Sequence, residues 1–221
     1  MRILRWIWHE IKLQWKNGLY VLYIAINLFY ILLLGYVPQQ YKELVTTLLL
    51  LSDPTFLGMI FVGGILLLER NQGIPKGIGV SPLGSTGYIM GKVISLLVIA
   101  LASGICIMGA GHMKFTFIRI ASLIVSGGLF TLMGIIIGSF AKGINHFMFL
   151  VAVFTMPFAI PLITYVFVPT WKFFIWIPTT STVYLLNHIG NSIAHMIYLF
   201  AWFIGTFILT KKVVEKEIFV R

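Results

Sequence analysis

The sequence predicts an all-α polytopic membrane protein with six transmembrane helices. Two observations lead to this prediction: 59% of the 221 residues are hydrophobic while 10% are charged, and the apolar residues gather in six long runs. A soluble domain usually has about 25% charged residues, so this chain lacks the polar side chains that would cover a surface in water. A helix of about 20 apolar residues crosses a bilayer core, and the six runs approach that length.

The expected spans follow one another along the whole chain, which we expect to form a single transmembrane domain over residues 1–221. They cover residues 19–37, 46–68, 88–110, 117–140, 147–168 and 193–210. Two prolines in the fifth span each remove a backbone donor and should kink that helix. An even number of spans places both termini on one side of the membrane.

Lys and Arg residues are distributed unevenly between the two sides of this topology. Twelve of the sixteen fall on the side of the termini, and the other four are Lys42, Lys114, Arg119 and Lys172. Cytoplasmic loops are enriched in Lys and Arg, so we expect both termini in the cytoplasm and the protein in the cell membrane. A net charge of +10 is also typical of nucleic-acid binding, but here the charges lie at the ends of apolar runs rather than on one polar face.

Residues 1–17 are expected to form an amphipathic helix on the inner membrane surface. Isoleucine, leucine and tryptophan residues form its apolar side, as in helices that bind at the headgroup level. Its polar stripe repeats at steps of three and four and consists of Arg2, Arg5, His9, Lys12 and Lys16. The alternative is a solvated basic terminus with scattered aromatic residues.

Asp53 and Pro54 interrupt the second span. An acid within a membrane segment is by default a candidate functional residue. Asp followed by Pro is also typical of a helix start, because Asp caps free amides and Pro is tolerated in the first turn. As a helix, residues 55–68 alone would rise only about 21 Å, which is short of a full crossing of the bilayer core. We therefore expect a kinked or two-part helix, and we favour a capping role for Asp53 over ion binding.

Residues 169–192 are too polar in their middle to cross a bilayer and too aromatic for a free loop. Aromatic side chains favour the headgroup level, so we expect an interfacial or re-entrant segment on the outer face. Non-helical backbone at that depth has to be sheltered by protein. A plain outer loop is the alternative.

The fourth span contains Gly134 and Gly138, which have the spacing Gly-x-x-x-Gly. Small residues let membrane helices approach one another closely. Packing within one chain explains this spacing as well as dimerisation does.

Enzymatic chemistry is not expected in this chain. The five histidines are scattered, no His, Asp and Glu residues have metal-ligand spacing, and no buried pair of carboxylates is expected. The Gly91-Lys92 pair is followed by Val93, and Thr86 stands where a phosphate-binding loop requires glycine. We therefore expect no cofactor in this chain.

Residues 69–87 connect the second span to the third. Connections are usually about 4–6 residues long, and this one is several times longer, with Gly73, Pro75 and Gly77 breaking regular structure early. A long loop with specific turn residues is usually functional. Its charges and small residues suit a docking surface for a soluble partner.

Residues 52–92 resemble the permease subunits of type-2 ABC exporters. The resemblance rests on an acid that ends the second span, a glycine after it, a Ser-Pro-Leu step, and a tyrosine and a lysine that open the third span: Glu69, Gly73, Ser81-Pro82-Leu83, Tyr88 and Lys92. The six spans, the basic surface helix and the polar-aromatic segment before the last span are similar too, so the resemblance covers nearly the whole chain.

The resemblance implies a short coupling helix within residues 69–87 that rests in a groove of a separate ATP-binding subunit. The coupling residues would be Glu69, Arg70, Gly73, Pro75, Lys76, Ser81, Pro82 and Leu83, supported by Arg5, His9, Lys12 and Lys16 of the surface helix. Two ATP-binding subunits would bind ATP and Mg²⁺, and two permease subunits, identical or related, would enclose the path. The glycines leave room for a coupling element of one or two turns.

The translocation path is expected along the first, second and fifth spans, with Asn27, Asp53 and Thr155 as polar candidates. An apolar lining suits an amphiphilic drug, antibiotic, peptide or lipid better than an ion. Two other classes stay open. In a secondary transporter Asp53 would be the coupling residue, although no inverted repeat is evident. An anchor or immunity-type protein would bind a partner without transport.

Overall fold

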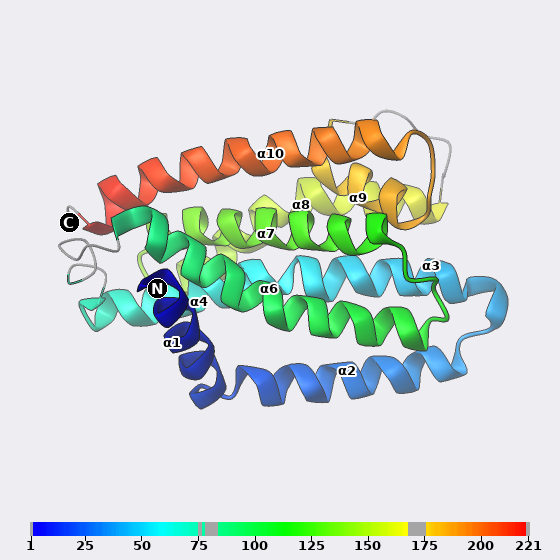
Figure 1. Cartoon of the computed structure of the whole chain (residues 1–221), viewed down its shortest axis with the longest axis horizontal. Helices are drawn as coiled ribbons and strands as arrows, with labels where there is room; N and C mark the ends of the chain where they lie inside the picture. The colour runs from blue at the N-terminus through cyan, green and yellow to red at the C-terminus, as the bar shows by residue number, and fades with distance from the viewer. Residues whose placement is uncertain (1, 75–76, 78–83, 168–175, 220–221) are drawn as a thin grey trace.

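The computed structural model is a bundle of long helices that run roughly side by side (Figure 1). It describes residues 2–74, 77, 84–167 and 176–219, and no β-strand occurs among them. Six helical stretches are long and apolar enough to cross a membrane, so the predicted all-α class with six candidate spans is confirmed. The elements are α1 (Arg2–Lys16), α2 (Leu19–Tyr36), α3 (Gln39–Leu50), η1 (Leu51–Thr55), α4 (Leu57–Asn71), α6 (Gly84–Ala110), α7 (Phe117–Phe140), α8 (Ile144–Phe167), α9 (Pro178–Leu186), α10 (Ser192–Val213) and η2 (Val214–Phe219).

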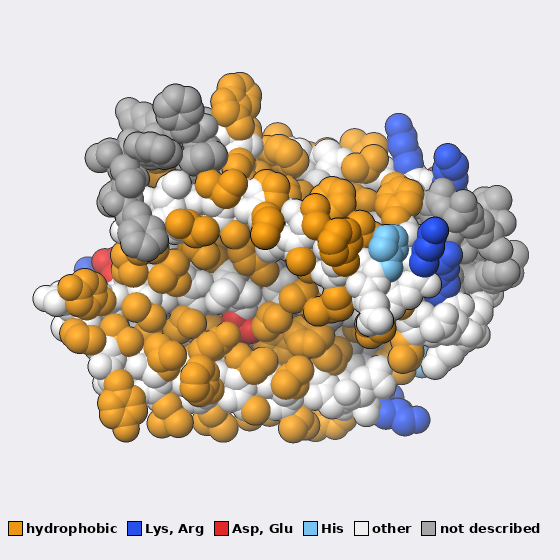
Figure 2. Space-filling model, turned by 180° about the vertical axis from the view of Figure 1, so that it is seen from behind, with side chains coloured by type: hydrophobic (Ala, Val, Ile, Leu, Met, Phe, Trp, Pro, Cys, Tyr) orange, Lys and Arg blue, Asp and Glu red, His pale blue; other side chains and the backbone are white. Residues whose placement is uncertain are grey.

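Both ends of the described chain lie at the same end of the bundle, and α1 runs across that end (Figure 1). We call it the proximal end, and the opposite one the distal end. Figure 2 shows apolar side chains over the middle of the rear face and most of its Lys and Arg side chains at the proximal end. An apolar middle between charged ends is the surface expected of a protein that spans a bilayer.

The second span is one continuous helical run, Gln39–Asn71, in which the π-helical turn η1 separates α3 from α4. The irregularity expected at Asp53 and Pro54, as a kinked or two-part helix, is therefore present, but the helical run is not broken there. Pro54 has no N–H and cannot bond to the Leu50 carbonyl one turn earlier. The Thr55 hydroxyl donates to that carbonyl oxygen instead, at 3.1 Å, and the backbone widens into the single π-helical turn η1. This turn accommodates the proline without ending the helix.

The close approach of α4 and α7 depends on glycines. A Cβ atom on Gly134 would lie against the backbone of Met59, and one on Gly138 would lie against Leu66 and Gly63. The Gly-x-x-x-Gly spacing therefore serves packing within this chain, which was one of the two explanations considered for it.

The short helix α9 lies at the distal end beside α8 and α10 (Figure 1). Pro178 occupies its first turn, where proline is well tolerated, and its run of hydroxyl side chains, 179–182, is buried. The plain loop is thus wrong for Pro178–Leu186. Residues 168–175 lie outside the described residues, and re-entry of this segment into a membrane stays a prediction.

Candidate functional site

The helix predicted at the amino terminus is present as α1, and two of its three faces agree with the prediction. The basic stripe is exposed: Arg5, His9, Lys12 and Lys16. Leu4, Trp8 and Trp15 are exposed as well, between 63% and 70%, as suits a helix whose apolar side meets lipid headgroups. The third face, which the sequence analysis missed, carries Glu10 and Gln14, each 1% exposed.

This third face packs against the beginning of α6. The Trp6 ring occupies the space that a side chain at Gly91 would need, and Gln14 Nε2 donates to Ser95 Oγ at 2.7 Å. Because Trp6, Glu10 and Gln14 are four residues apart, they lie on one side of α1. The Gly91-Lys92 pair therefore serves helix packing: Gly91 makes room for Trp6, and Lys92 meets Glu10.

Lys92 lies between two carboxylates inside the protein. Its Nζ is 2.5 Å from Glu69 Oε1 of α4 and 3.2 Å from Glu10 Oε1 of α1. Tyr88 Oη donates to Glu69 Oε2 at 2.7 Å. No one of these four residues is more than 1% exposed. We call Glu10, Glu69, Tyr88 and Lys92 the proximal network, and it joins α1, α4 and α6.

The proximal network holds two carboxylates and one ammonium. Burial raises the pKa of the Glu10 carboxyl above its ordinary value, because the charged form loses its water; the Lys92 ammonium acts in the opposite direction. Glu10 has the longer contact with Lys92, so it is the carboxyl that we expect to take up a proton. Removing Lys92 would leave both carboxylates buried without a counter-charge, which is strongly destabilising.

The expectation that no buried pair of carboxylates exists is wrong. Glu10 and Glu69 belong to distant segments of the sequence, and only the packing of α1 onto the bundle brings them to the same ammonium. Lys92 stands near the start of the third span, on the side where the topology gathers most Lys and Arg residues, and it is buried within α6. The spacing of Trp6, Glu10 and Gln14 was the available signal for this contact.

Three of the eight predicted coupling residues are among the described residues: Glu69, Arg70 and Gly73. Glu69 is buried, while Arg70 is exposed and its Nη1 donates to the carbonyl oxygens of Ser139 at 3.3 Å and Ala141 at 3.2 Å. Gly73 follows α4 with φ of 71°, a left-handed conformation that favours glycine. The others lie outside the described residues: Pro75, Lys76, Ser81, Pro82 and Leu83.

Two of the three predicted path residues meet in the middle of the bundle. Ser103 Oγ of α6 lies 2.9 Å from Asp53 Oδ2 and 3.0 Å from Asn27 Oδ1. The single hydroxyl proton can serve only one of these oxygens. Asp53 is fully buried, and its Oδ1 has no hydrogen-bond partner among the described residues.

The capping role expected for Asp53 is wrong, because its carboxylate faces α6 and makes no capping hydrogen bond at η1 or α4. The third candidate, Thr155, lies apart from this pair on α8, where its hydroxyl donates to the Val151 carbonyl oxygen of the same helix at 2.6 Å. The structure therefore unites Asn27 and Asp53 and leaves Thr155 separate.

The described residues contain no group of three or more His, Cys, Asp or Glu residues that could hold a metal ion. No protein family matches the chain in a comparison with family models, and no curated protein matches it.

Proposed function

We propose that this chain is the transmembrane permease subunit of an ATP-driven exporter and works with a separate ATP-binding subunit. The observation that carries the proposal is the proximal network, which ties the transverse helix α1 to α4 and α6. These are the two spans that flank residues 72–83, where the ATP-binding subunit would dock. The protein would lie in the cell membrane, with both termini in the cytoplasm.

The proximal network supports transmission of movement from a docked subunit to the spans. The ionic contact of Lys92 with Glu10 and the hydrogen bond between Gln14 and Ser95 hold α1 against α6. A force on α1 or on residues 72–83 would therefore displace α4 and α6 together, as a flexible linker would not. Glu69 would transmit the movement from inside the protein rather than contact the partner.

The remaining partners follow from the same proposal. The exposed basic stripe of α1 would face the ATP-binding subunit or acidic headgroups, and two ATP-binding subunits would bind ATP and Mg²⁺. A second permease subunit, identical or related, would complete the path. The outward sides of α2 and α8 are apolar, with Phe29 and Phe149 both more than half exposed. Such walls suit an amphiphilic substrate: a drug, an antibiotic, a peptide or a lipid.

The test uses two of the three tryptophans of α1, Trp6 and Trp8, as a matched pair. Trp6→Ala removes the side chain that packs on Gly91, and Trp8→Ala removes an exposed one. The full chain is co-purified with its candidate ATP-binding subunit, and ATPase rate and export are measured in proteoliposomes. We expect Trp6→Ala to keep the spans folded and to lower coupled export about tenfold, the upper part of the range for coupling residues.

Trp8→Ala should leave export near the wild-type rate. Failure of the wild-type chain to bind any ATP-binding subunit, or equal export by both variants, would contradict the proposal. Pro82→Ala tests docking separately, because the resemblance places this residue in the coupling segment.

Proton-coupled secondary transport is a second candidate, favoured by the unpartnered Asp53 Oδ1. An ionisable side chain within the bilayer is a candidate proton relay. The measurement is flux in proteoliposomes that contain this chain alone, with a pH gradient and no ATP. Gradient-driven flux that Asp53→Asn abolishes and Thr155→Val retains would replace the exporter proposal.

A further inference from the structure

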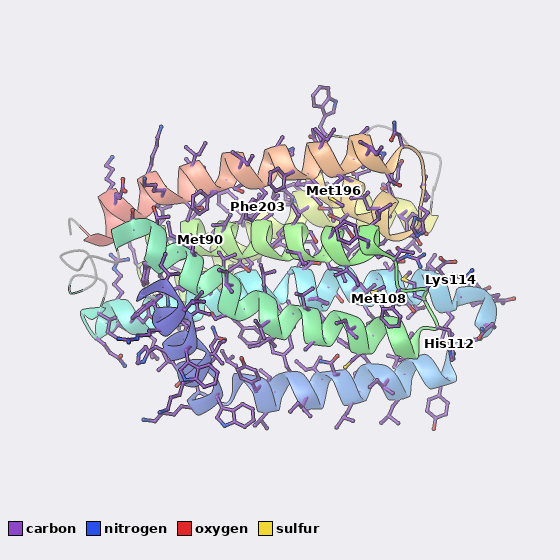
Figure 3. The ribbon with its side chains drawn as sticks, in the orientation of Figure 1. Met90, Met108, His112, Lys114, Met196 and Phe203 are labelled. Carbon is purple, nitrogen blue, oxygen red and sulfur yellow. The ribbon has the colours of Figure 1, made fainter. Side chains whose placement is uncertain are left out.

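The distal end contains a cavity of about 340 Å³ whose lining is unusually rich in charge. It lies between the start of α3, the connection from α6 to α7, and the residues after α9. The charged and titratable side chains that line it are Lys42, Glu43, His112, Lys114, Arg119 and His188. Figure 3 shows His112 and Lys114 at this end of the bundle, close to α3.

Sequence proximity alone does not bring the cationic residues together at this cavity. The predicted topology leaves four Lys and Arg residues on the distal side, and three of them, Lys42, Lys114 and Arg119, line this single cavity. Lys42 belongs to α3, whereas Lys114 and Arg119 follow α6 in the sequence. Folding therefore gathers these cations.

Arg119 is a built-in part of the cavity wall. It is 5% exposed, its Nε donates to the Leu186 carbonyl oxygen at 2.6 Å, and its Nη1 donates to the Lys114 carbonyl oxygen at 2.7 Å. These two bonds fix the guanidinium plane. Among the described residues the Nη2 group reaches only Glu43 Oε1, at the long distance of 3.5 Å, and that carboxylate is itself exposed.

Both histidines of the cavity adopt a backbone conformation that favours glycine. His112 has φ of 54° and His188 has φ of 53°. Each lies at a helix end closed by a backbone hydrogen bond that reaches five residues back, from Met113 N to the Met108 carbonyl oxygen at 2.9 Å and from Ile189 N to the Tyr184 carbonyl oxygen at 2.8 Å. Strained positions of non-glycine residues cluster at functional sites, and these two lie at the same cavity.

The cavity has a net positive charge and lies among exposed aromatic side chains. Among the described residues, neither Lys42 nor Lys114 has an ion-pair partner, so Glu43 is the one acid that faces three cations. The flanking segments expose four aromatic rings: Tyr36, Tyr41, Phe115 and Phe117. Aromatic rings gather at the headgroup level of a bilayer, where phosphate groups are abundant.

We propose that the distal cavity binds a phosphate group, carried by an anionic phospholipid or free in solution. The Lys42 and Lys114 ammonium groups and Arg119 Nη2 donate charge-assisted hydrogen bonds to it, and the two imidazoles add further donors. Glu43 competes with the ligand for Arg119. This binding chemistry is independent of the proposed export function.

The test measures thermal stabilisation of the purified full chain in detergent by three probes: inorganic phosphate, phosphatidylglycerol and phosphatidylcholine. One double variant, Lys42→Gln with Lys114→Gln, removes two cations from the cavity. Its control, Lys211→Gln with Lys212→Gln, removes two exposed cations from the proximal end. A third variant, Glu43→Gln, removes the competing carboxylate and acts in the opposite direction.

We expect the cavity variant to weaken the apparent Kd at least about tenfold, the control to leave it unchanged, and Glu43→Gln to tighten it severalfold. Stabilisation by phosphatidylglycerol alone would assign the phosphate to an anionic lipid, and stabilisation by inorganic phosphate as well would show that a phosphate with net negative charge binds whether or not a lipid carries it. Equal affinities in the cavity and control variants, or no preference for phosphatidylglycerol or phosphate over phosphatidylcholine, would overturn the proposal.

Discussion

The two ends of the bundle hold their charged side chains in opposite ways. At the proximal end, Lys92 is enclosed with Glu10 and Glu69, so the proximal network has two carboxylates for one ammonium. At the distal end, Arg119 is fixed by backbone carbonyls while Lys42 lines an open cavity in which cations are in excess. One arrangement is closed and the other is open.

This difference concerns where the charged groups find their partners: within the protein at the proximal network, and in an added ligand at the distal cavity. In the proximal network the charges find their partners within the protein, and the desolvation cost of Glu10 is offset only while α1 stays docked against Lys92. At the distal cavity, donors that have no strong partner in the chain gain most from an added acceptor. The first arrangement therefore couples helices to one another, and the second suits a ligand.

The largest effect is expected from Lys92→Met, which breaks the closed side of the comparison. It leaves Glu10 and Glu69 buried without a cation, and we expect a loss of about 3–5 kcal/mol in the free energy of unfolding. The measurement is unfolding by sodium dodecyl sulfate in mixed micelles. Lys12→Met, an exposed substitution on α1, is the control and should have little effect. Equal stabilities would mean that the network does not hold the helices together.

An intermediate effect is expected from Arg119→Lys at the open end. The lysine keeps the charge but cannot reproduce the rigid fork that donates to the Leu186 and Lys114 carbonyls. We expect the free energy of unfolding to fall by about 1–3 kcal/mol. If Arg119→Lys were as stable as the wild type, the guanidinium would act through its charge alone.

The smallest effect at neutral pH is expected from Glu10→Gln, which leaves one carboxylate for one ammonium. Because burial raises the pKa of Glu10, the folded protein binds this proton more tightly than the unfolded chain does. The contribution of Glu10 to stability is thus fully present below its ordinary pKa of 4.5 and is lost as pH rises through the higher folded value. As pH rises, the wild type should lose stability relative to Glu10→Gln in the window that begins near pH 4.5 and ends at the higher folded pKa.

Parallel unfolding curves for the wild type and Glu10→Gln across that pH window would show that Glu10 titrates as it does in water. The contrast between the two ends would then rest on enclosure rather than on the protonation of Glu10.

The sequence by itself determined the six candidate spans and the amphipathic helix at the amino terminus. Hydropathy and helical periodicity are properties of neighbouring residues. The helices Leu19–Tyr36 and Arg2–Lys16 can therefore be predicted without any knowledge of the fold. The expectations for the second span were less successful. A π-helical turn at Pro54 depends on one local hydrogen bond from Thr55, which residue type alone does not indicate.

Only the tertiary structure decided which charges meet. Glu10 and Lys92 each look like surface residues at the edge of a helix, and the packing of Trp6 on Gly91 is what places them together. Likewise, Lys42 and Arg119 become neighbours of one cavity only when α3 lies beside the start of α7. The physical reason is that apolar patterning specifies which helices form, whereas the pairing of polar groups between helices depends on their rotation and separation in the packed bundle.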